Sequence, residues 1–238
     1  MGTRNIVKAC EKYKVARLVM ISTDKAVQPV NIMGASKRFA EMIVLDAAHR
    51  TGKAYCVVRF GNVLGSRGSV VPLFKRQIAR GGTITITHPD MKRYFMTIPE
   101  AVYLVLQAAG MSKGCETFVL NMGQQVNILD LAEDLIRLSG LEPGKDIEIV
   151  YTGIRPGEKL SEDLWEDGKL FTPTKHPDIF KLNDPSNLRD DELLKNIKEL
   201  LFFADKGKTG EIITLVDQVI PGSAVANTPP LKLTSIDQ

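Results

Sequence analysis

The stretch that decides the fold is residues 16–25, which read Ala-Arg-Leu-Val-Met-Ile-Ser-Thr-Asp-Lys. The apolar run from Ala16 to Ile21 is typical of a buried strand, and polar residues follow it directly. In open α/β sheets, ligands bind beyond the carboxyl ends of the strands. The stretch therefore predicts a strand that delivers Thr23, Asp24 and Lys25 to a site, although a Ser-Thr-Asp tripeptide taken alone is more often a simple turn.

Helices are expected on both sides of this strand. Residues 1–14 carry apolar side chains at helical spacing, and so do residues 31–50, in which Met33 and Lys37 lie one turn apart on one face. Helix and strand patterns continue to alternate downstream, which predicts an α/β fold. The expected strands are 54–60, 83–87, 117–121 and 146–151, and the expected helices are 71–80, 99–111, 128–139, 189–203 and 209–219.

The composition is that of an ordinary folded domain. The chain has 238 residues, of which 44% are hydrophobic and 25% charged, and this is enough for a sizeable core. A net charge of +3 is too small to indicate a nucleic-acid or membrane surface. Cys10, Cys56 and Cys115 form no metal-ligand pattern or disulfide framework, and no apolar run reaches the roughly eighteen residues of a spanning helix. We expect no metal, no nucleic acid and no membrane segment, and a cytoplasmic location.

Several longer motifs resemble one enzyme family. The Ser-Thr-Asp strand, followed by a helix in which Met33 stands four residues before Lys37, is similar to the extended short-chain dehydrogenase/reductase superfamily. The longer motifs, quoted below, resemble one family within it, the UDP-N-acetylglucosamine 4,6-dehydratases. The resemblance covers roughly residues 1–183. Met33 stands where the superfamily usually has the tyrosine of Tyr-x-x-x-Lys, and a thioether cannot relay a proton; some members of the dehydratase family share this methionine. The motifs are Arg59-Phe60-Gly61-Asn62-Val63-Leu64-Gly65-Ser66, residues 68–72, residues 87–101 and Arg155-Pro156-Gly157-Glu158-Lys159-Leu160.

The resemblance implies the carboxyl-terminal part of a Rossmann-type doubly wound parallel sheet, with a smaller α/β substrate-binding subdomain. A dinucleotide site needs a glycine-rich turn between its first strand and helix, and the chain has none. Gly61, Gly65 and Gly68 are expected to be loop glycines. We therefore expect a carboxyl-terminal fragment of the complete enzyme. Its expected divisions are a partial Rossmann domain (residues 1–70), a UDP-sugar subdomain interleaved with late Rossmann elements (71–185), a helical extension (186–220) and a disordered tail (221–238).

The implied reaction is oxidation of the sugar at C4 with NAD, loss of water across C5 and C6, and return of the hydride to C6. Elimination needs an acid and a base, and the resemblance indicates Asp24 as the acid and Lys25 as the base. A lysine base must be partly neutral, which desolvation or the nearby Lys37 could achieve. Thr23 is expected to bond the C4 oxygen, and Met33 to pack beside the sugar.

The remaining implied roles concern the cofactor and the nucleotide. Lys37 would bond the nicotinamide ribose, and Ser22 and Phe60 would complete the cofactor side. Arginine suits bidentate phosphate recognition, although Arg155-Pro156-Gly157-Glu158 alone could be a solvated turn closed by an ion pair. The residues expected to bind the UDP-sugar are Asn62, Ser69, Val70, Arg93, Arg155 and Glu158.

Two alternatives stay open: a UDP-sugar epimerase, and a non-catalytic fragment or interaction module. The absent glycine-rich unit leads us to expect poor turnover, weak UDP binding and negligible NAD binding by the chain alone. Relatives associate through the helix bearing Lys37 and the helix before the Ser-Thr-Asp strand. A homo-oligomer is therefore expected of the complete form.

Overall fold

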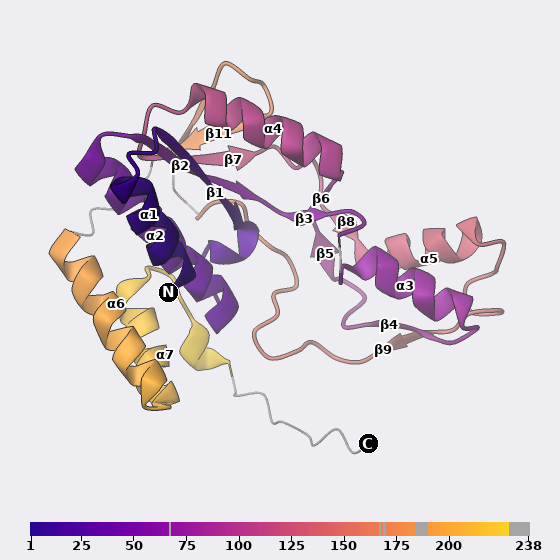
Figure 1. Cartoon of the computed structure of the whole chain (residues 1–238). Coiled ribbons are helices and arrows are strands. Elements are labelled where there is room, and N and C mark those ends of the chain that lie inside the picture. The colour runs from indigo at the N-terminus through magenta and orange to yellow at the C-terminus, as the bar shows by residue number, and fades with distance from the viewer. Residues whose placement is uncertain (67, 167, 169, 184–189, 229–238) are drawn as a thin grey trace.

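The computed structural model describes residues 1–66, 68–166, 168, 170–183 and 190–228, and it has two lobes (Figure 1). The large lobe is built on a five-stranded sheet in the order β1-β2-β7-β11-β10. Its elements are α1 (Gly2–Lys12), β1 (Arg17–Thr23), the 3-10 turn η1 (Asp24–Ala26), α2 (Ile32–Thr51), β2 (Ala54–Phe60), α4 (Ile98–Met111), β7 (Glu116–Leu120), β10 (Phe171–Pro173) and β11 (Ile179–Leu182).

The small lobe packs α3 and α5 against the parallel pair β4 and β9. Two short pairs, β3 with β6 and β5 with β8, lie where the chain passes between the lobes (Figure 1). The small-lobe elements are α3 (Val70–Ala79), β4 (Ile84–Ile86), α5 (Ile128–Leu138) and β9 (Ile149–Tyr151), and the connecting strands are β3 (Asn62–Val63), β5 (Lys92–Arg93), β6 (Phe95–Met96) and β8 (Val126–Asn127).

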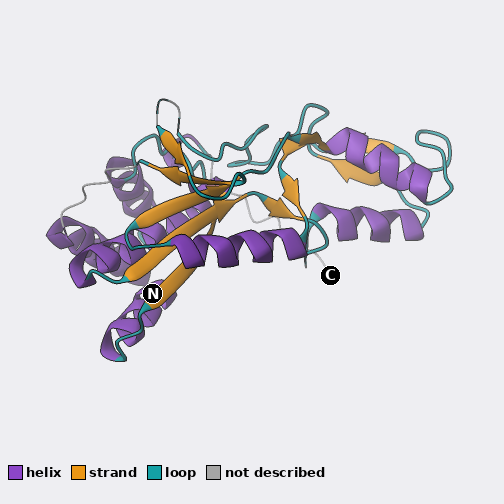
Figure 2. Cartoon of the chain, turned by 90° about the horizontal axis from the view of Figure 1, so that it is seen from above, coloured by secondary structure: helices purple, strands orange, loops and turns teal. Residues whose placement is uncertain are grey.

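The central strands β2 and β7 are mostly apolar and buried because helices cover both faces of the sheet (Figure 2). Alternate residues of β2 divide between two cores, so that Tyr55 and Val57 pack with α1 and α2 while Cys56 and Val58 pack with α4. β1, β2 and β7 run parallel, and β10 and β11 are antiparallel. This arrangement confirms the expected doubly wound α/β class.

The parallel register of β1 and β2 brings the two polar strand ends together. It pairs Ser22 with Arg59 and Thr23 with Phe60. The residues that follow these two strand ends, η1 after β1 and Gly61 and Asn62 after β2, therefore lie beside one another. Gly61 and Asn62 begin the connection to the small lobe. A site can form here because parallel strands present their carboxyl ends at one edge of the sheet.

A buried ion cluster fixes α2 on the sheet. Glu41 of α2 accepts hydrogen bonds from Arg59 Nε at 2.8 Å and Arg59 Nη2 at 2.6 Å, and from Arg38 Nη1 at 2.9 Å. Burial alone would raise the pKa of Glu41, but Arg59 and Arg38 outweigh it and hold that pKa below its ordinary value. Asn31 caps the start of the helix, its side chain accepting from the Gly34 amide, and Gly52, with φ 64°, caps the end.

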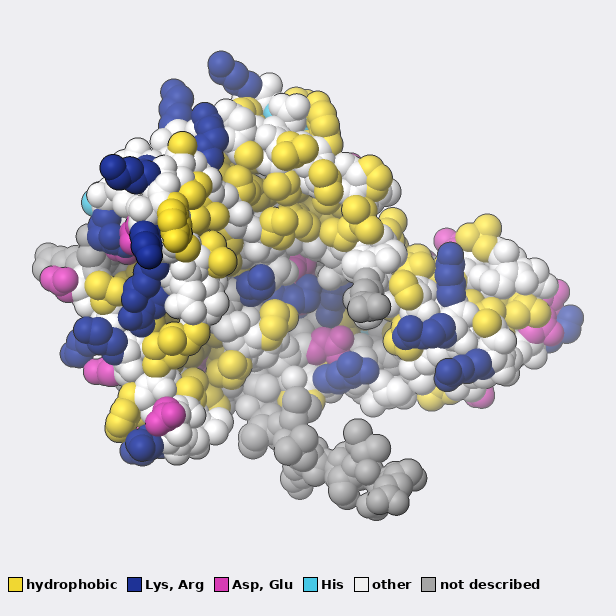
Figure 3. Space-filling view, in the orientation of Figure 1, with side chains coloured by type: hydrophobic (Ala, Val, Ile, Leu, Met, Phe, Trp, Pro, Cys, Tyr) yellow, Lys and Arg dark blue, Asp and Glu magenta, His cyan; other side chains and the backbone are white. Residues whose placement is uncertain are grey.

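Apolar side chains gather on the outside of α4 and beside β1 (Figure 3). Within the described residues, β1 pairs with β2 alone, and Ile21 is 54% exposed. On α4, Val102, Tyr103 and Leu106 are more than half exposed. A strand edge of this kind is able to pair with another chain. Among the helices described, none is long and apolar enough to cross a membrane.

The carboxyl-terminal helices α6 (Asp190–Asp205) and α7 (Thr209–Val219) pack on the outer side of α2, around Phe39 and Met42. They cover part of the helix expected to form a subunit contact, and the oligomer stays a prediction. Residues 221–228, assigned from sequence to a disordered tail, instead form a turn, η2 (Val225–Asn227), with Val225 buried. Asp217 accepts from two amides of this turn, which the composition of the segment could not reveal. Residues 229–238 lie outside the described part, and the domain boundaries stay a prediction.

Candidate functional site

The predicted acid and base lie side by side at the end of β1. Asp24 Oδ1 accepts from the Thr23 hydroxyl at 2.7 Å, from the Lys25 amide at 2.9 Å and from Lys25 Nζ at 3.0 Å. The Asp24 side chain is fully buried, and its Oδ2 has no hydrogen-bond partner among the described residues. The turn therefore holds one carboxylate oxygen tightly and leaves the other available.

Lys25 joins this turn to the other strand end. Its Nζ donates to Asn62 Oδ1 at 3.3 Å, and Asn62 begins β3, separated from the end of β2 by Gly61. The lysine side chain is 24% exposed, so its amine has access to solvent while the carboxylate beside it has none. Lys25 therefore connects the buried Asp24 carboxylate to Asn62, at the start of the connection between the lobes.

A carboxylate that sequence reasoning missed lies on the far side of Lys25. Glu162 Oε1 is 3.8 Å from Lys25 Nζ, and the Glu162 side chain is 6% exposed. Burial raises the pKa of Glu162; Lys25 lowers it and Asp24 raises it, with a net rise. No local signal identifies this residue, because Glu162 follows the Arg-Pro-Gly-Glu motif and meets Lys25 only through the fold.

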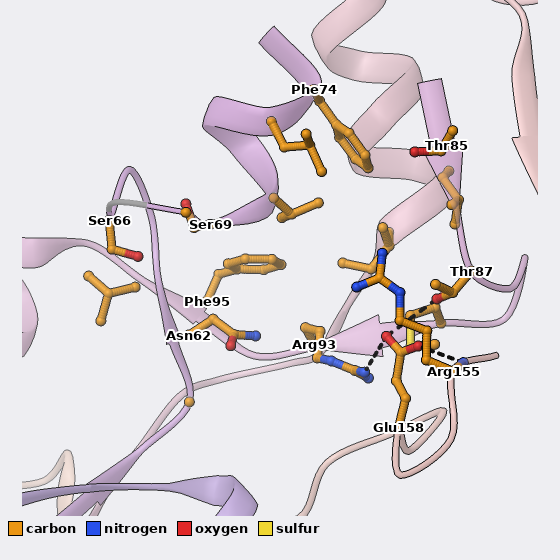
Figure 4. Close-up of a pocket in the computed structure, with 18 residues that line it drawn as sticks. Asn62, Ser66, Ser69, Phe74, Thr85, Thr87, Arg93, Phe95, Arg155 and Glu158 are labelled. Carbon is orange, nitrogen blue, oxygen red and sulfur yellow. Dashed lines mark hydrogen bonds and ion pairs between the residues drawn. The ribbon is translucent and has the colours of Figure 1, made fainter. Parts of the chain in front are cut away.

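The six residues predicted to bind the UDP-sugar line one cavity of about 580 Å³ between β3, α3, β4 and the loop after β9 (Figure 4). Phe74 and Phe95 give the cavity apolar walls, and Ser69 marks the amino end of α3. The Ser69 hydroxyl is buried and has no hydrogen-bond partner among the described residues. The cavity therefore combines apolar surface with a small number of polar groups, as small-molecule sites do.

The charged end of the cavity is an arrangement of two arginines about one carboxylate. Glu158 Oε1 is 3.6 Å from Arg93 Nη2 and accepts from the Thr87 hydroxyl at 3.4 Å, while Glu158 Oε2 accepts from the Arg155 amide at 3.2 Å. Arg93 also donates to the carbonyl of Leu160 at 3.0 Å. The Arg155 guanidinium points into the cavity (Figure 4). The turn is thus closed by Glu158 through a backbone amide, which leaves the Arg155 side chain available for an anion.

The residues predicted near the cofactor do not line the cavity formed by those predicted to bind the UDP-sugar. Met33 is 49% exposed and Lys37 is exposed, one turn along the same face of α2, and Ser22 is buried at the end of β1. Phe60, predicted on the cofactor side, packs in the core beneath α4. The first turn of α2 lies against η1, since a Cβ on Gly34 would overlap the Lys25 carbonyl oxygen. Among these four candidates, only Lys37 presents an exposed donor.

The loop between η1 and α2 is held by a second lysine that the sequence did not single out as functional. Lys159 Nζ donates to the Val27 carbonyl at 3.0 Å, and Asn31 Nδ2 donates to the Gly157 carbonyl at 2.7 Å. The segment that carries Arg155 and Glu158 is therefore attached to the loop that follows Lys25. The His88 ring contacts Asp90 of its own loop. The described residues contain no cluster of three or more metal-binding side chains.

Comparison with known proteins places the chain in a family. Residues 1–184 match the model of the family described as polysaccharide biosynthesis protein. The chain is 53% identical over 182 residues to the capsular polysaccharide biosynthesis protein CapD of Staphylococcus aureus, a match that covers 76% of this chain and 30% of CapD. It is 40% identical over 167 residues to a UDP-glucose 4-epimerase of Rickettsia canadensis, covering 69% of this chain and 48% of the epimerase.

Solved structures agree with the fold. Pen from Bacillus thuringiensis superposes with a TM-score of 0.69 at 37% identity, covering 80% of this chain and 59% of Pen. A dTDP-glucose 4,6-dehydratase, DesIV from Streptomyces venezuelae, solved with NAD bound, has a TM-score of 0.60 at 22% identity, covering 68% of this chain and 55% of DesIV; this likeness concerns the fold alone. The chain spans about a third to three fifths of the length of these proteins. It belongs to the polysaccharide biosynthesis protein family, and its fold is that of nucleotide-sugar dehydratases and epimerases.

Proposed function

We propose that this chain carries the substrate-binding lobe and the acid–base pair of a UDP-N-acetylglucosamine 4,6-dehydratase that serves the synthesis of bacterial surface polysaccharide. The observation that supports the proposal is the position of Asn62. Its side chain lines the cavity that holds Arg155, and it also accepts from Lys25. A nucleotide bound in the cavity would therefore place its sugar next to the Asp24 and Lys25 pair.

The cavity suits a nucleoside diphosphate. Phe74 and Phe95 offer apolar surface to a base, and Arg155 offers a planar, permanently charged fork to a diphosphate. The Ser69 hydroxyl and the Val70 amide, at the amino end of α3, are further donors for phosphate oxygens. Glu158, already beside Arg93, would accept from ribose hydroxyls.

The proton steps are assigned to the turn after β1. Lys25, in its neutral form, takes the proton as the C5–H bond breaks, and protonated Asp24 gives its proton to the C6 hydroxyl as the C6–O bond breaks and water leaves. The proton released by the C4 hydroxyl on oxidation would pass through Thr23, whose hydroxyl lies 2.7 Å from Asp24 Oδ1, and restore the acid. The Lys25 ammonium would return its proton to C5 when the hydride returns to C6. Lys37 would hold NAD at its ribose, and NAD would supply the hydride exchange; the ketone formed at C4 would make the C5 proton acidic. Thr23 would bond the C4 oxygen, and Met33 would pack beside the sugar.

Calorimetric titration of the chain with UDP tests the substrate side. We expect weak binding that Arg155→Ala weakens by about tenfold or more, since hydrogen bonds to charged groups contribute about 1.5–3 kcal/mol each. Arg80→Ala removes an exposed arginine of the same lobe that does not line the cavity, and it is expected to leave UDP binding unchanged. Equal UDP affinity of the chain and of Arg155→Ala would contradict this assignment.

A second candidate, a UDP-sugar 4-epimerase, is favoured by the 40% identity to the Rickettsia enzyme. An epimerase returns the hydride to C4 and needs no acid–base pair at C5 and C6, so Asp24 and Lys25 favour dehydration. The product from UDP-N-acetylglucosamine and NAD separates the two reactions, because only a dehydratase yields a 4-keto-6-deoxy sugar. We expect poor turnover by the chain alone, because it lacks a glycine-rich dinucleotide turn, and robust NAD-dependent turnover would refute that expectation.

A further inference from the structure

The segment of residues 155–162 reaches both halves of the site. Arg155 and Glu158 line the cavity proposed to bind the nucleotide. Glu162 follows in the same segment, and its Oε1 lies 3.8 Å from Lys25 Nζ. Lys25 is therefore between two carboxylates, since Asp24 Oδ1 lies 3.0 Å away. The Asn62 amide oxygen, at 3.3 Å, is its third acceptor.

The backbone around Glu162 is held on both sides. The Leu160 carbonyl accepts from the Lys92 amide at 2.9 Å and from Arg93 Nη1 at 3.0 Å. Gln125 donates from Nε2 to the Glu162 carbonyl at 2.7 Å and accepts from the Ser161 hydroxyl at 2.7 Å. These contacts come from β5 and from the loop before β8, so the small-lobe connection fixes where the Glu162 carboxyl lies. Its approach to Lys25 is part of the fold and does not depend on a mobile surface side chain.

We propose that Glu162 is a positioning residue of the acid–base pair, which orients the Lys25 amine towards Asn62 and stabilises the ammonium that forms when Lys25 takes a proton. The proposal rests on the function proposed above. A base that is itself oriented by a third, buried group is a recurring arrangement in enzymes, because the third group stabilises the charge that develops on the base. Asp24 cannot serve this purpose alone, since it is also assigned the role of the acid.

The surroundings of Glu162 suit this role. Apart from Lys25 and Asp24, the charged groups that face it are Arg93 and Lys159, both cationic, so its carboxylate is compensated although it is buried. The net effect of burial and charge is a pKa of Glu162 above the ordinary value. Glu162 therefore takes up a proton at a higher pH than a surface glutamate does. Protonation removes the negative charge beside Lys25, which couples the pair to pH.

The test measures the chemical reactivity of Lys25 in the full chain, because only a neutral amine attacks an acylating reagent. Lys25 is modified with an N-hydroxysuccinimide ester at several pH values above neutrality, and the rate at each lysine is read by mass spectrometry. Glu162→Gln keeps the shape of the side chain and removes its charge. We expect Lys25 to react about threefold or more faster in Glu162→Gln at a given pH, the effect of losing a partly buried ion pair. Lys145, an exposed lysine paired with Glu142, is the internal reference.

Asp163→Asn is the matched control, because it removes the same charge from the neighbouring, exposed position. Its Lys25 rate should equal that of the unchanged chain, and Glu162→Asp, which keeps the charge on a shorter side chain, should give an intermediate rate. A Lys25 profile that Glu162→Gln leaves unchanged, or that Asp163→Asn alters as much, would overturn the proposal. Thermal unfolding of each variant identifies loss of folding, and Glu162→Asp then carries the comparison. The UDP titration is independent of this assay, so the failure of either hypothesis is visible without the other.

Discussion

Removal of the Glu41 carboxylate is the most informative perturbation of the scaffold that carries the site. Glu41 accepts two hydrogen bonds from the Arg59 guanidinium, from Nε at 2.8 Å and from Nη2 at 2.6 Å. The side chains of both residues are fully buried. The contact attaches α2, which bears Met33 and Lys37, to the end of β2, which precedes Asn62. In Glu41→Ala the Arg59 guanidinium stays buried and loses its counter-ion.

The expected cost is large because the buried Arg59 guanidinium would be left without its counter-charge. Breaking a buried ion pair by removing one partner destabilises proteins by about 3–5 kcal/mol, out of a total stability of about 5–15 kcal/mol. Replacing both partners is cheaper, since no unpaired charge remains. Glu41→Leu combined with Arg59→Met should therefore be more stable than Glu41→Ala, and Arg38 retains Glu166 at 3.9 Å in that variant.

Urea unfolding, followed by circular dichroism and by the fluorescence of the only tryptophan, Trp165, measures these differences. Glu133→Ala is the matched control, because Glu133 forms an exposed ion pair with Arg137 on α5, where the expected loss is below about 1 kcal/mol. If Glu41→Ala cost no more than Glu133→Ala, the reasoning from burial would be refuted.

The same cluster predicts a dependence on pH with a definite sign. Arg59 and Arg38 outweigh burial and hold the pKa of Glu41 below 4.5 in the folded chain. A carboxylate with a lowered folded pKa contributes stability above its unfolded pKa, and the contribution is lost as the pH falls through the folded value. Stability should therefore fall below about pH 4.5, and part of this decline should be absent in Glu41→Gln. A decline of the same size in Glu41→Gln would assign it to other carboxylates.

Two further predictions concern single positions. Gly34→Ala should strongly destabilise the chain and disturb Lys25, because the new methyl group would overlap the Lys25 carbonyl. Gly110→Ala, in open space on α4, should instead stabilise the chain by about 0.5–1 kcal/mol. Thermal unfolding of both variants checks this, and equal effects would contradict it. Cys56 is fully buried, and burial raises the pKa of its thiol. An alkylating reagent at neutral pH should therefore label Cys56 only after unfolding. Prompt labelling in the folded chain would contradict this.

The sequence predicted those parts of the fold that local pattern determines. Periodicity found β2 at 54–60 and α7 at 209–219 with the bounds that the structure has. The strands it missed, such as β5 and β10, are two and three residues long and exist because a distant segment pairs with them. Too short for a recognisable period, they leave no local signal.

The candidate site divides in the same way. Motif resemblance named Asn62 and Arg155, which line one cavity although they lie far apart in the sequence. Neither pattern nor motif identified Glu162, because its significance depends on the distance to Lys25, a property of the folded chain. The resemblance also suggested Phe60, whose side chain proves to be part of the core beneath α4. Strand ends are predictable in this fold, whereas the direction of a side chain at a strand end is not.

Gly61 explains how the two halves of the site come so close. A Cβ at this position would lie 2.7 Å from Tyr94 Cβ and 3.3 Å from Asp24 Oδ2. A side chain here would therefore separate this position from Tyr94, which precedes β6, and crowd the Asp24 carboxylate, and Asn62 would move with the displaced backbone. The glycine lets the backbone of the connection pass next to the free oxygen of the buried Asp24 carboxylate. The acid–base pair and the nucleotide cavity are thus joined at one residue without a side chain, which is why a contact as short as that between Lys25 and Asn62 can span two lobes.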